Sequence, residues 1–420
     1  MSLEALKKDV ASAIDALAPE LLALSHAIHQ EPELALEEFK AVARLTKSVE
    51  AHGLPVQREA YGLKTAYVSE FGSGGPAIGI LSEYDALPGI GHACGHNIIA
   101  TAGLGAALAL AKLKERLPGR VRYLGTPAEE RFGGKELMAR AGGFDGLDAA
   151  MMIHPANLDL ATMPCIAVSE VEATYHGRAA HAAAMPYRGL NALDAVVTAY
   201  QSIAQLRQHI RQSERIHGII TEGGVAPNIV PERAVCRFYV RAADVHQLTE
   251  LKVRVRACFE AGALATGCKL DLHWGGTDYL DLKTNWPMAG AFEGNAEALG
   301  REFFPLKDIP AGFAGSTDMG NVSHRVPSIH PMLSVAPAGV IIHNPEFTRW
   351  AASERGDAAV LDGAKAMAQT ALDLMCDAAL MTRVKSDFQA TAELSQRAID
   401  KLEESAGHSH GAPHTGCGCA

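Results

Sequence analysis

The chain has 420 residues, a formal net charge of −10, 48% hydrophobic residues and 20% charged residues. This length suffices for two domains, and the composition is typical of a globular protein rather than a disordered or fibrous one. The acidic balance and the lack of a basic block argue against nucleic-acid binding. The eight cysteines have no disulfide-framework spacing, which favours a reducing compartment, so we expect a cytoplasmic protein.

The first 30 residues predict helices. Apolar residues recur at steps of three and four from Leu6 to Ile28, which is the period of one helix face. Pro19 is expected to begin a second helix, because proline is tolerated in a first turn but not in a helix interior. The segment lacks the continuous apolar core of a signal peptide, and no apolar run reaches the roughly 18 residues of a membrane span. We therefore expect no membrane partner.

Four short apolar runs each end in a cluster of polar residues. The runs are residues 77–81, 121–125, 149–153 and 339–342. Each is apolar at consecutive positions, which is typical of strands buried on both faces of a mostly parallel sheet. Ligands of open α/β sheets bind beyond the carboxyl ends of the strands, and every one of these ends is followed by His, Glu or Cys. A functional site is therefore expected where the ends meet.

A different pattern begins near Val168. The expected elements, in order, are a strand at 170–181, a helix at 190–208, strands at 216–224 and 232–242, a helix at 245–265 and a strand at 269–276. This order predicts an α+β, ferredoxin-like domain at 168–282, inserted into an α/β domain formed by 1–167 and 283–400. Residues 401–420, which contain His and Cys, are predicted to form a flexible tail.

The strand ends supply thiolate, imidazole and carboxylate groups. The candidates are Cys94, His96, Glu129, Glu130, His154 and His343. This mixture suits zinc or a similar first-row divalent metal. A catalytic zinc usually keeps three protein ligands, so the set suits two metals that share a ligand, roughly 3.5–4 Å apart. In an extended segment the adjacent Glu129 and Glu130 would point to opposite sides, which would let one bind metal and the other act as general base.

Other chemistry is compatible with part of this set. Cys94 could be a thiol nucleophile beside a histidine, although a thiol hydrolase needs neither Glu129 nor Glu130. The His and Cys residues of 407–420 could instead serve metal delivery in a protein without hydrolytic turnover. A single strand-end histidine is more often structural than a ligand. Four such ends together favour hydrolysis of an amide by a metal-activated water.

The motifs GHACGHN, TPAEE, MMIHP and VIIHNPEF resemble those of the aminoacylase/carboxypeptidase family of di-metal peptidases and amidohydrolases. Within it, the chain is similar to the branch of hippurate hydrolase and auxin-conjugate amidohydrolases. It looks most like aminobenzoyl-glutamate hydrolase and dipeptidase-like members, which share EYDALPGIGHACGHN. The resemblance covers about residues 20–390 and implies an α/β metallopeptidase domain with an inserted lid that also forms a homodimer.

The resemblance also implies the reaction and the cofactors. It implies two divalent metal ions per subunit, with zinc preferred and manganese, cobalt or nickel as alternatives. The substrate would be a small N-acyl, N-aroyl or dipeptide amide, and the product would be a free amino acid. The identity of the acyl half and of the amino acid stays open.

Transferred residue by residue, the resemblance implies a specific site. The implied metal ligands are Cys94, His96, Glu130, His154 and His343. Glu129 would act as general base and acid, and His181 would reach the site of the partner subunit and stabilise the oxyanion. Asn228 and Arg241 would contact the carboxylate of the substrate.

The sequence departs from the family pattern at two places. Glu83-Tyr84-Asp85 stands where other branches have a His-x-Asp pair, so we expect Asp85 to support the ligands rather than bind metal. Residues 316–319 read STDM where the family has Ser-Glu-Asp-Phe, which leaves the local substrate pocket undetermined.

Overall fold

A computed structural model describes residues 2–309 and 314–407, with side chains described up to residue 404. The described chain divides into two compact units, and each is presented by itself. The main unit comprises residues 2–165 and 282–395, and the inserted unit comprises residues 166–281 and 396–407. The insertion starts and ends within two residues of the boundaries that the sequence predicts.

The main unit is built on a six-stranded sheet with the order β1-β2-β4-β3-β5-β11. Its strands are β1 (Gln57–Arg58), β2 (Tyr67–Gly72), β3 (Ala77–Ser82), β4 (Arg120–Gly125), β5 (Ala149–Met151) and β11 (Ser328–Ile329). Strands β4, β3, β5 and β11 are parallel, and β2 and β1 add an antiparallel edge. A short parallel pair, β6 (His154–Ala156) and β12 (Met332–Ser334), continues beyond it. The mostly parallel α/β sheet predicted from the sequence is confirmed.

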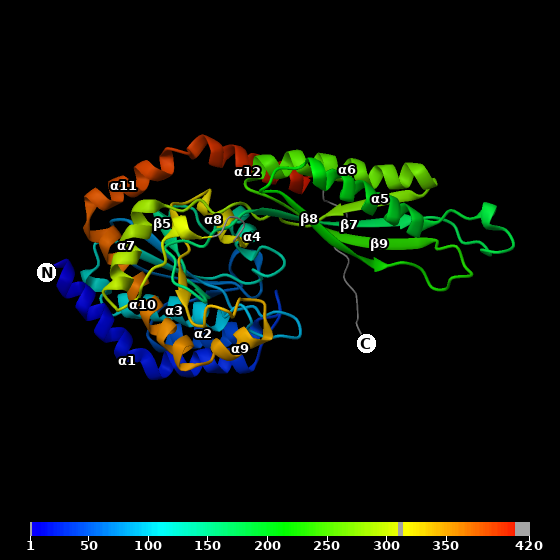
Figure 1. The fold of residues 1–420 in the computed structure, drawn as a ribbon. Coiled ribbons are helices and arrows are strands. Elements are labelled where there is room, and N and C mark those ends of the chain that lie inside the picture. Colours follow the sequence, from blue (N-terminus) through cyan, green and yellow to red (C-terminus); the bar gives the residue numbers. More distant parts are fainter. Residues whose placement is uncertain (1, 310–313, 408–420) are drawn as a thin grey trace. The chain divides into compact units, whose positions relative to one another are not determined.

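Helices cover both faces of this sheet (Figure 1). They are α1 (Leu3–Gln30), α2 (Phe39–Ala51), α3 (His96–Ala111), α4 (Gly134–Arg140), α7 (Trp286–Glu297), α8 (Met319–Ser323), α9 (Pro345–Trp350), α10 (Glu354–Cys376) and α11 (Ala378–Gln389). All six residues of β3 are buried. Ile78 and Ile80 join the core formed with α1, α3 and α10, whereas Leu81 joins a second cluster that includes residues of α4 and α8. Apolar residues at consecutive positions follow from this burial on two sides.

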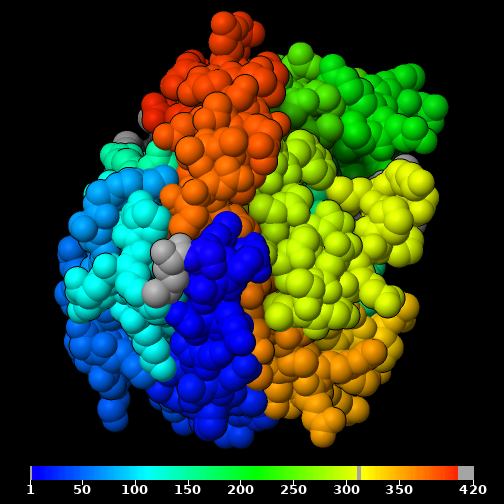
Figure 2. All heavy atoms as spheres, turned by 90° about the vertical axis from the view of Figure 1, so that its left-hand side faces the viewer, coloured from blue at the N-terminus to red at the C-terminus, as the bar shows by residue number. Residues whose placement is uncertain are grey.

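Helix α1 corrects one prediction, because it continues through Pro19 without a break. Leu17 and Leu21, on either side of Pro19, are buried, so the buried face of the helix continues through this turn. Pro19 is exposed. Asp15 is exposed as well, and its carbonyl lacks the usual helical hydrogen bond because proline has no N–H. Figure 2 shows the outer face of α1, in blue, lying between segments that are distant in sequence. By length and hydropathy α1 is the one helix of the described chain that could cross a membrane, a test that core helices also pass.

The inserted unit has the predicted order of elements. They are β7 (Ala167–His176), α5 (Ala192–Leu206), β8 (Arg215–Glu222), β9 (Arg233–Ala242), α6 (Val245–Thr266) and β10 (Lys269–Trp274). The sheet order is β10-β7-β9-β8, all neighbouring strands are antiparallel, and α5 and α6 cover one face (Figure 1). The predicted ferredoxin-like α+β insertion is confirmed, and β8 and β10 are its two edge strands.

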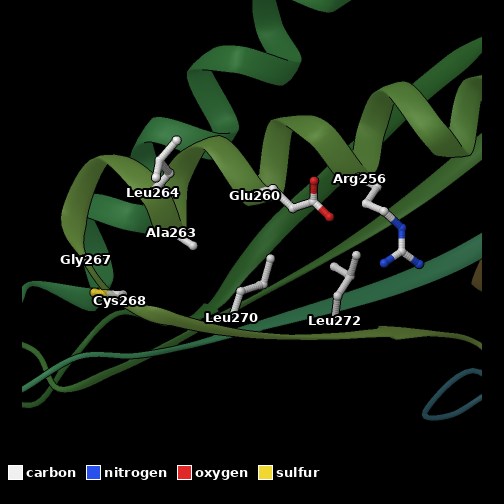
Figure 3. Close-up of a pocket in the computed structure, with 8 residues that line it drawn as sticks. All are labelled: Arg256, Glu260, Ala263, Leu264, Gly267, Cys268, Leu270 and Leu272. Atoms are coloured by element: carbon white, nitrogen blue, oxygen red, sulfur yellow. The ribbon is translucent and has the colours of Figure 1, made fainter.

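A groove of about 590 Å³ lies between α6 and the edge strand β10 (Figure 3). Leu264, Leu270 and Leu272 give it apolar walls, and Arg256 and Glu260 stand along the helix. Leu264 is 86% exposed, so the groove is open to solvent.

The C-terminal helix α12 (Ala392–Gly407) corrects the prediction of a flexible tail for residues 401–407. Residues 401–407 are helical, and Leu402 and Ala398 are buried against Val245 and Leu280 of the inserted unit. An apolar helix face therefore continues past the predicted boundary at residue 400. The histidines and cysteines of the tail, His408, His410, His414, Cys417 and Cys419, lie outside the described residues.

The described chain also contains short 3-10 turns. They are η1 (Ala60–Gly62), η2 (Lys114–Arg116), η3 (Pro186–Arg188), η4 (Arg207–His209) and η5 (Leu306–Asp308).

Candidate metal centre

The loop after β3 brings Cys94 and His96 against strand β6. His96 is the first residue of α3, and Gly95 before it has φ 77°. A Cβ at Gly95 would lie 2.4 Å from Cγ of Pro155, so glycine is required both by conformation and by contact. The close approach places Cys94 Sγ 3.4 Å from Nε2 of His154. Two of the predicted strand ends therefore meet.

The carboxylates after β4 lie in a turn and not in the extended segment that the sequence suggested. Ala128 has φ 62°, and its carbonyl accepts hydrogen bonds from the amides of Phe132, Gly133 and Gly134. The turn still directs the two side chains to different neighbours. Glu130 lies 3.6 Å from Nε2 of His343, whereas Glu129 groups with Glu83 and His96.

The strand predicted at 339–342 is wrong, because this segment is a loop that ends in a turn. Ile341 is 58% exposed and Ile342 is half-buried, and these apolar residues line a pocket instead of joining the sheet. The loop nevertheless delivers its histidine. The amide of His343, with φ 62°, donates to the carbonyl of Ala93, and His343 Nε2 lies 3.5 Å from Sγ of Cys94.

Two groups of potential metal ligands share Cys94. The first is Cys94, His96 and His154, and the second is Cys94, Glu130 and His343. Within each group the ligand atoms lie within 4.8 Å of one another. Nε2 of His96 and Oε1 of Glu130 are buried and make no hydrogen bond, although Oε1 of Glu83 lies 3.2 Å from this His96 nitrogen. A thiolate, imidazoles and a carboxylate with unused buried atoms fit divalent metal ions, and a shared thiolate fits a pair of them.

The ring nitrogens that face away from Cys94 are held by other groups. Nδ1 of His96 lies 3.2 Å from Oδ1 of Asp85, and Nδ1 of His154 lies 2.7 Å from the carbonyl of Pro155. The other oxygen of Asp85 accepts a hydrogen bond from the amide of Glu130 at 2.9 Å. Asp85 thus fixes one imidazole and the backbone of one carboxylate, an arrangement that orients metal ligands in many sites.

Sequence reasoning missed a second layer of buried charge. Lys135 is fully buried, and its Nζ lies 2.5 Å from Oε2 of Glu83 and 2.6 Å from Oδ1 of Asp318. The other oxygen of Glu83 lies 3.2 Å from Nε2 of His96. Glu83 had one usable signal: it stands two residues before Asp85 at the end of β3, so both could face the same side. Lys135 and Asp318 are brought in by α4 and α8 and had no local signal.

Burial and carboxylate crowding shift the pKa values of the central groups. Burial, with Glu83, Glu130 and Asp318 adding repulsion, raises the pKa of Glu129 well above its usual range. Burial also raises the pKa of Glu130 to about 7 and lowers that of His154 to about 4. These pKa shifts describe the site without cations. Bound cations would instead favour the ionised carboxylates and the neutral imidazoles.

The environment of Cys94 bears on the thiol-hydrolase alternative. Burial, followed by the charge of Glu130, raises the pKa of the Cys94 thiol well above its usual range. A nucleophilic thiol requires the opposite shift. A bound cation would itself favour the thiolate, so the raised pKa counts against a metal-free thiol nucleophile but not against Cys94 as a metal ligand.

Three predicted residues lie in the inserted unit. The exposed His181 forms an isolated bridge with Ile229, and Ala182 donates to the carbonyl of Asn228 at 3.0 Å, so His181 and Asn228 stand on adjoining loops. Arg241 lies near the end of β9, opposite Arg215 and Val168. Their roles toward a substrate stay predictions.

A mostly parallel sheet with Cys, His and Glu at its carboxyl end, interrupted by a ferredoxin-like insertion, defines a metallohydrolase architecture. Residues 79–378 match the model of peptidase family M20/M25/M40. The chain belongs to this family, and it is a hydrolase that acts on carbon–nitrogen bonds of acyl amino acids or dipeptides. Metal dependence is typical of the family.

Individual relatives agree with this assignment. The chain is 41% identical to the Xaa-Arg dipeptidase of Mus musculus over 409 residues, 94% of each chain. It is 28% identical to one component of the p-aminobenzoyl-glutamate hydrolase of Escherichia coli, over 87% of this chain and 91% of that one. In fold it matches a dinuclear metal-binding M20 peptidase of Bacillus subtilis with a TM-score of 0.65 at 20% identity, covering 86% of this chain and 99% of that structure.

Proposed function

We propose that the protein binds two divalent metal ions and hydrolyses the amide of an N-acyl amino acid, an N-aroyl amino acid or a dipeptide. The observation that carries the proposal is the pair of ligand groups joined by Cys94. Cys94, His96 and His154 would hold one ion, and Cys94, Glu130 and His343 the other. Divalent ions in these positions would polarise the scissile carbonyl and lower the pKa of a water molecule.

Glu129 is proposed to carry the proton. It is buried beside the ligands, with a side chain that groups with Glu83 and His96 and is not needed in either shared set. It takes the proton of the attacking water and returns it to the leaving amine. The hydrogen bonds of Asp85 and of the Pro155 carbonyl keep the imidazoles oriented throughout.

The substrate class is proposed from two relatives. Their names describe action on Xaa-Arg dipeptides and on p-aminobenzoyl-glutamate. Both classes, together with N-acetyl and N-benzoyl amino acids, belong in a first screen. We propose zinc as the metal and manganese, cobalt or nickel as alternatives, because thiolate, imidazole and carboxylate ligands suit all four.

The decisive experiment is a hydrolysis screen on protein reconstituted with each metal, with release of the free amino acid as the readout. Glu129→Gln should lose turnover by about 10²–10⁴-fold while its metal content, measured by elemental analysis, stays that of the wild type. Deletion of residues 408–420 is the matched control and should leave hydrolysis unchanged. Full activity in Glu129→Gln would remove the assigned base, and loss of activity on deletion would favour the metal-delivery alternative.

The inserted unit is proposed to complete the enzyme as a cytoplasmic homodimer. Strand β8 is an open edge with exposed Ile219 and Ile220, and such an edge can pair with the same strand of a second copy. We propose that His181 stabilises the oxyanion across the dimer and that Asn228 and Arg241 bind the carboxylate of the substrate. A thiolate ligand such as Cys94 also suits a reducing compartment.

A further inference from the structure

An apolar pocket of about 270 Å³ lies in the main unit. Ala156, Met163 and Met332 form part of its wall, and Ile341 and Ile342 form another part. Met163 and Met332 are only 6% and 4% exposed, whereas Ile341 is 58% exposed. The pocket therefore has a buried floor and an accessible rim.

The walls of this pocket are continuous with two of the metal-capable histidines. Ala156 ends strand β6, which begins at His154, and Met332 of β12 is the register partner of His154. Ile341 and Ile342 directly precede His343 in the chain. The same two segments therefore supply one ligand to each metal group and the apolar wall beside it.

The chemistry of the lining disfavours a charged occupant. Among the described residues that line the pocket, none carries a charge. Nδ2 of Asn157 donates to the carbonyl of Ala338 at 2.8 Å, which leaves its Oδ1 as a neutral acceptor only. A guanidinium or ammonium group placed there would lose its hydration without a carboxylate to compensate, and burial of an unpaired charge is costly.

We propose that this pocket is the specificity pocket for an uncharged aliphatic or aromatic group attached next to the scissile amide. The proposal rests on the proposed hydrolase function and adds the chemical class of one substrate group. The volume lies just below the roughly 300–1,000 Å³ of pockets that enclose whole drug-sized ligands, so it suits one large apolar group. An Arg side chain would have to bind elsewhere.

The test measures binding rather than turnover. Metal-loaded Glu129→Gln protein is titrated calorimetrically with two series of compounds. In one series the acyl group grows from acetyl to butyryl, hexanoyl and benzoyl on glycine, and in the other the amino acid of an N-acetyl compound changes from glycine to leucine and phenylalanine. Affinity should rise by about 10-fold or more with apolar size in one of the two series. The series that shows this rise identifies the half of the substrate that enters the pocket.

Two variants connect that preference to the pocket. Ile341→Asp, at the exposed rim, should reduce the preference for large apolar groups by about 10-fold. Leu394→Asp is the matched control, since Leu394 is 53% exposed in the main unit and does not line the pocket, and it should retain the preference. Gly315→Ala should penalise only the largest groups, because its added Cβ would stand 2.9 Å from Cε of Met163, whose flexible end can shift.

The outcomes separate this proposal from the proposed function. Equal affinities throughout both series, or equal losses in Ile341→Asp and Leu394→Asp, would overturn the pocket. Hydrolysis is then assayed with the wild-type protein on the same compounds. A size preference that Ile341→Asp removes would support the pocket even if none of these compounds is hydrolysed, because binding and turnover are measured separately; hydrolysis itself is decided by the wider screen that includes Xaa-Arg dipeptides and p-aminobenzoyl-glutamate.

Discussion

The two units of the protein differ in the size of their pockets and in the charged groups that they bury. The inserted unit contains the larger hollow, about 590 Å³, but it is an open groove, and none of the metal-capable groups found in the described chain lies there. The main unit has a pocket half that size, beside a buried cluster of thiol, imidazole and carboxylate groups. Grouped metal-capable side chains distinguish the functional region better than cavity size does, because buried polar atoms cost free energy unless a ligand satisfies them.

The ion pairs of the two units show the same difference. In the main unit, Lys135, Glu83 and Asp318 have fully buried side chains. In the inserted unit, the Lys252–Asp278 pair is 2.6 Å long but keeps 13% and 7% side-chain exposure, and Lys252 also lies over the ring of Trp274. A dry cluster with one lysine for two carboxylates should depend on that lysine far more than a pair with access to water.

Replacing each lysine by methionine measures this contrast. Lys135→Met should lower the free energy of unfolding by about 3–5 kcal/mol, since it leaves two buried carboxylates without their cation. Lys252→Met should cost less, because it leaves one carboxylate rather than two without a cation and that pair keeps some access to water. Urea unfolding of the metal-free proteins gives both values and excludes loss of metal as the cause. Equal costs would show that burial does not separate the two units.

The next largest effect on the free energy of unfolding is expected from a carboxyl group of the main unit that titrates with pH. Glu38 is buried at the start of α2 and accepts a hydrogen bond from the amide of Ala128, next to the Glu129 turn. Burial, with the charge of Asp85 adding to it, raises the pKa of Glu38 from 4.5 to about 7. A raised pKa in the folded state gives stability that is fully present below pH 4.5 and is lost as pH rises through 7.

The matched variant is Glu38→Gln, which keeps an oxygen for the Ala128 amide but cannot ionise. Between pH 4.5 and 7 the wild type should lose up to about 3 kcal/mol of unfolding free energy that the variant does not lose. The difference between the two stability curves, measured by urea unfolding at several pH values, isolates this carboxyl. Parallel curves would mean that Glu38 stays ionised in the folded protein.

The part of the site that the sequence predicted is the part set by sheet geometry. Strands β3 and β5 are apolar at nearly every position and β4 is apolar apart from Arg120 and Arg122, and parallel strands bring their carboxyl ends together, so Cys94, Glu130 and His154 could be grouped in advance. His343 was placed correctly for an incorrect reason, because its apolar run lines a pocket rather than a sheet. Periodicity cannot distinguish these two uses of a short apolar segment.

What the sequence could not predict depends on contacts between distant elements. Lys135 and Asp318 are 183 residues apart, and only the packing of α4 against α8 brings them to Glu83. The turn at Ala128 uses a left-handed conformation that alanine rarely adopts, so no propensity argument suggests it. Pro19 is tolerated inside α1 because the lost hydrogen bond faces solvent, which the helix pattern alone does not reveal.

The smallest changes in stability are expected for substitutions at two exposed positions of the inserted unit. Ile219 of edge strand β8 and Val253 of helix α6 are 64% and 66% exposed, so lysine at either position should change the unfolding free energy by less than about 0.5 kcal/mol. Their effects on assembly should nevertheless differ. If β8 pairs with its copy, Ile219→Lys places like charges along the shared edge and should convert a dimer to a monomer in sedimentation velocity. Val253→Lys should leave the dimer intact, and identical masses for the wild type and both variants would exclude β8 as the dimer contact.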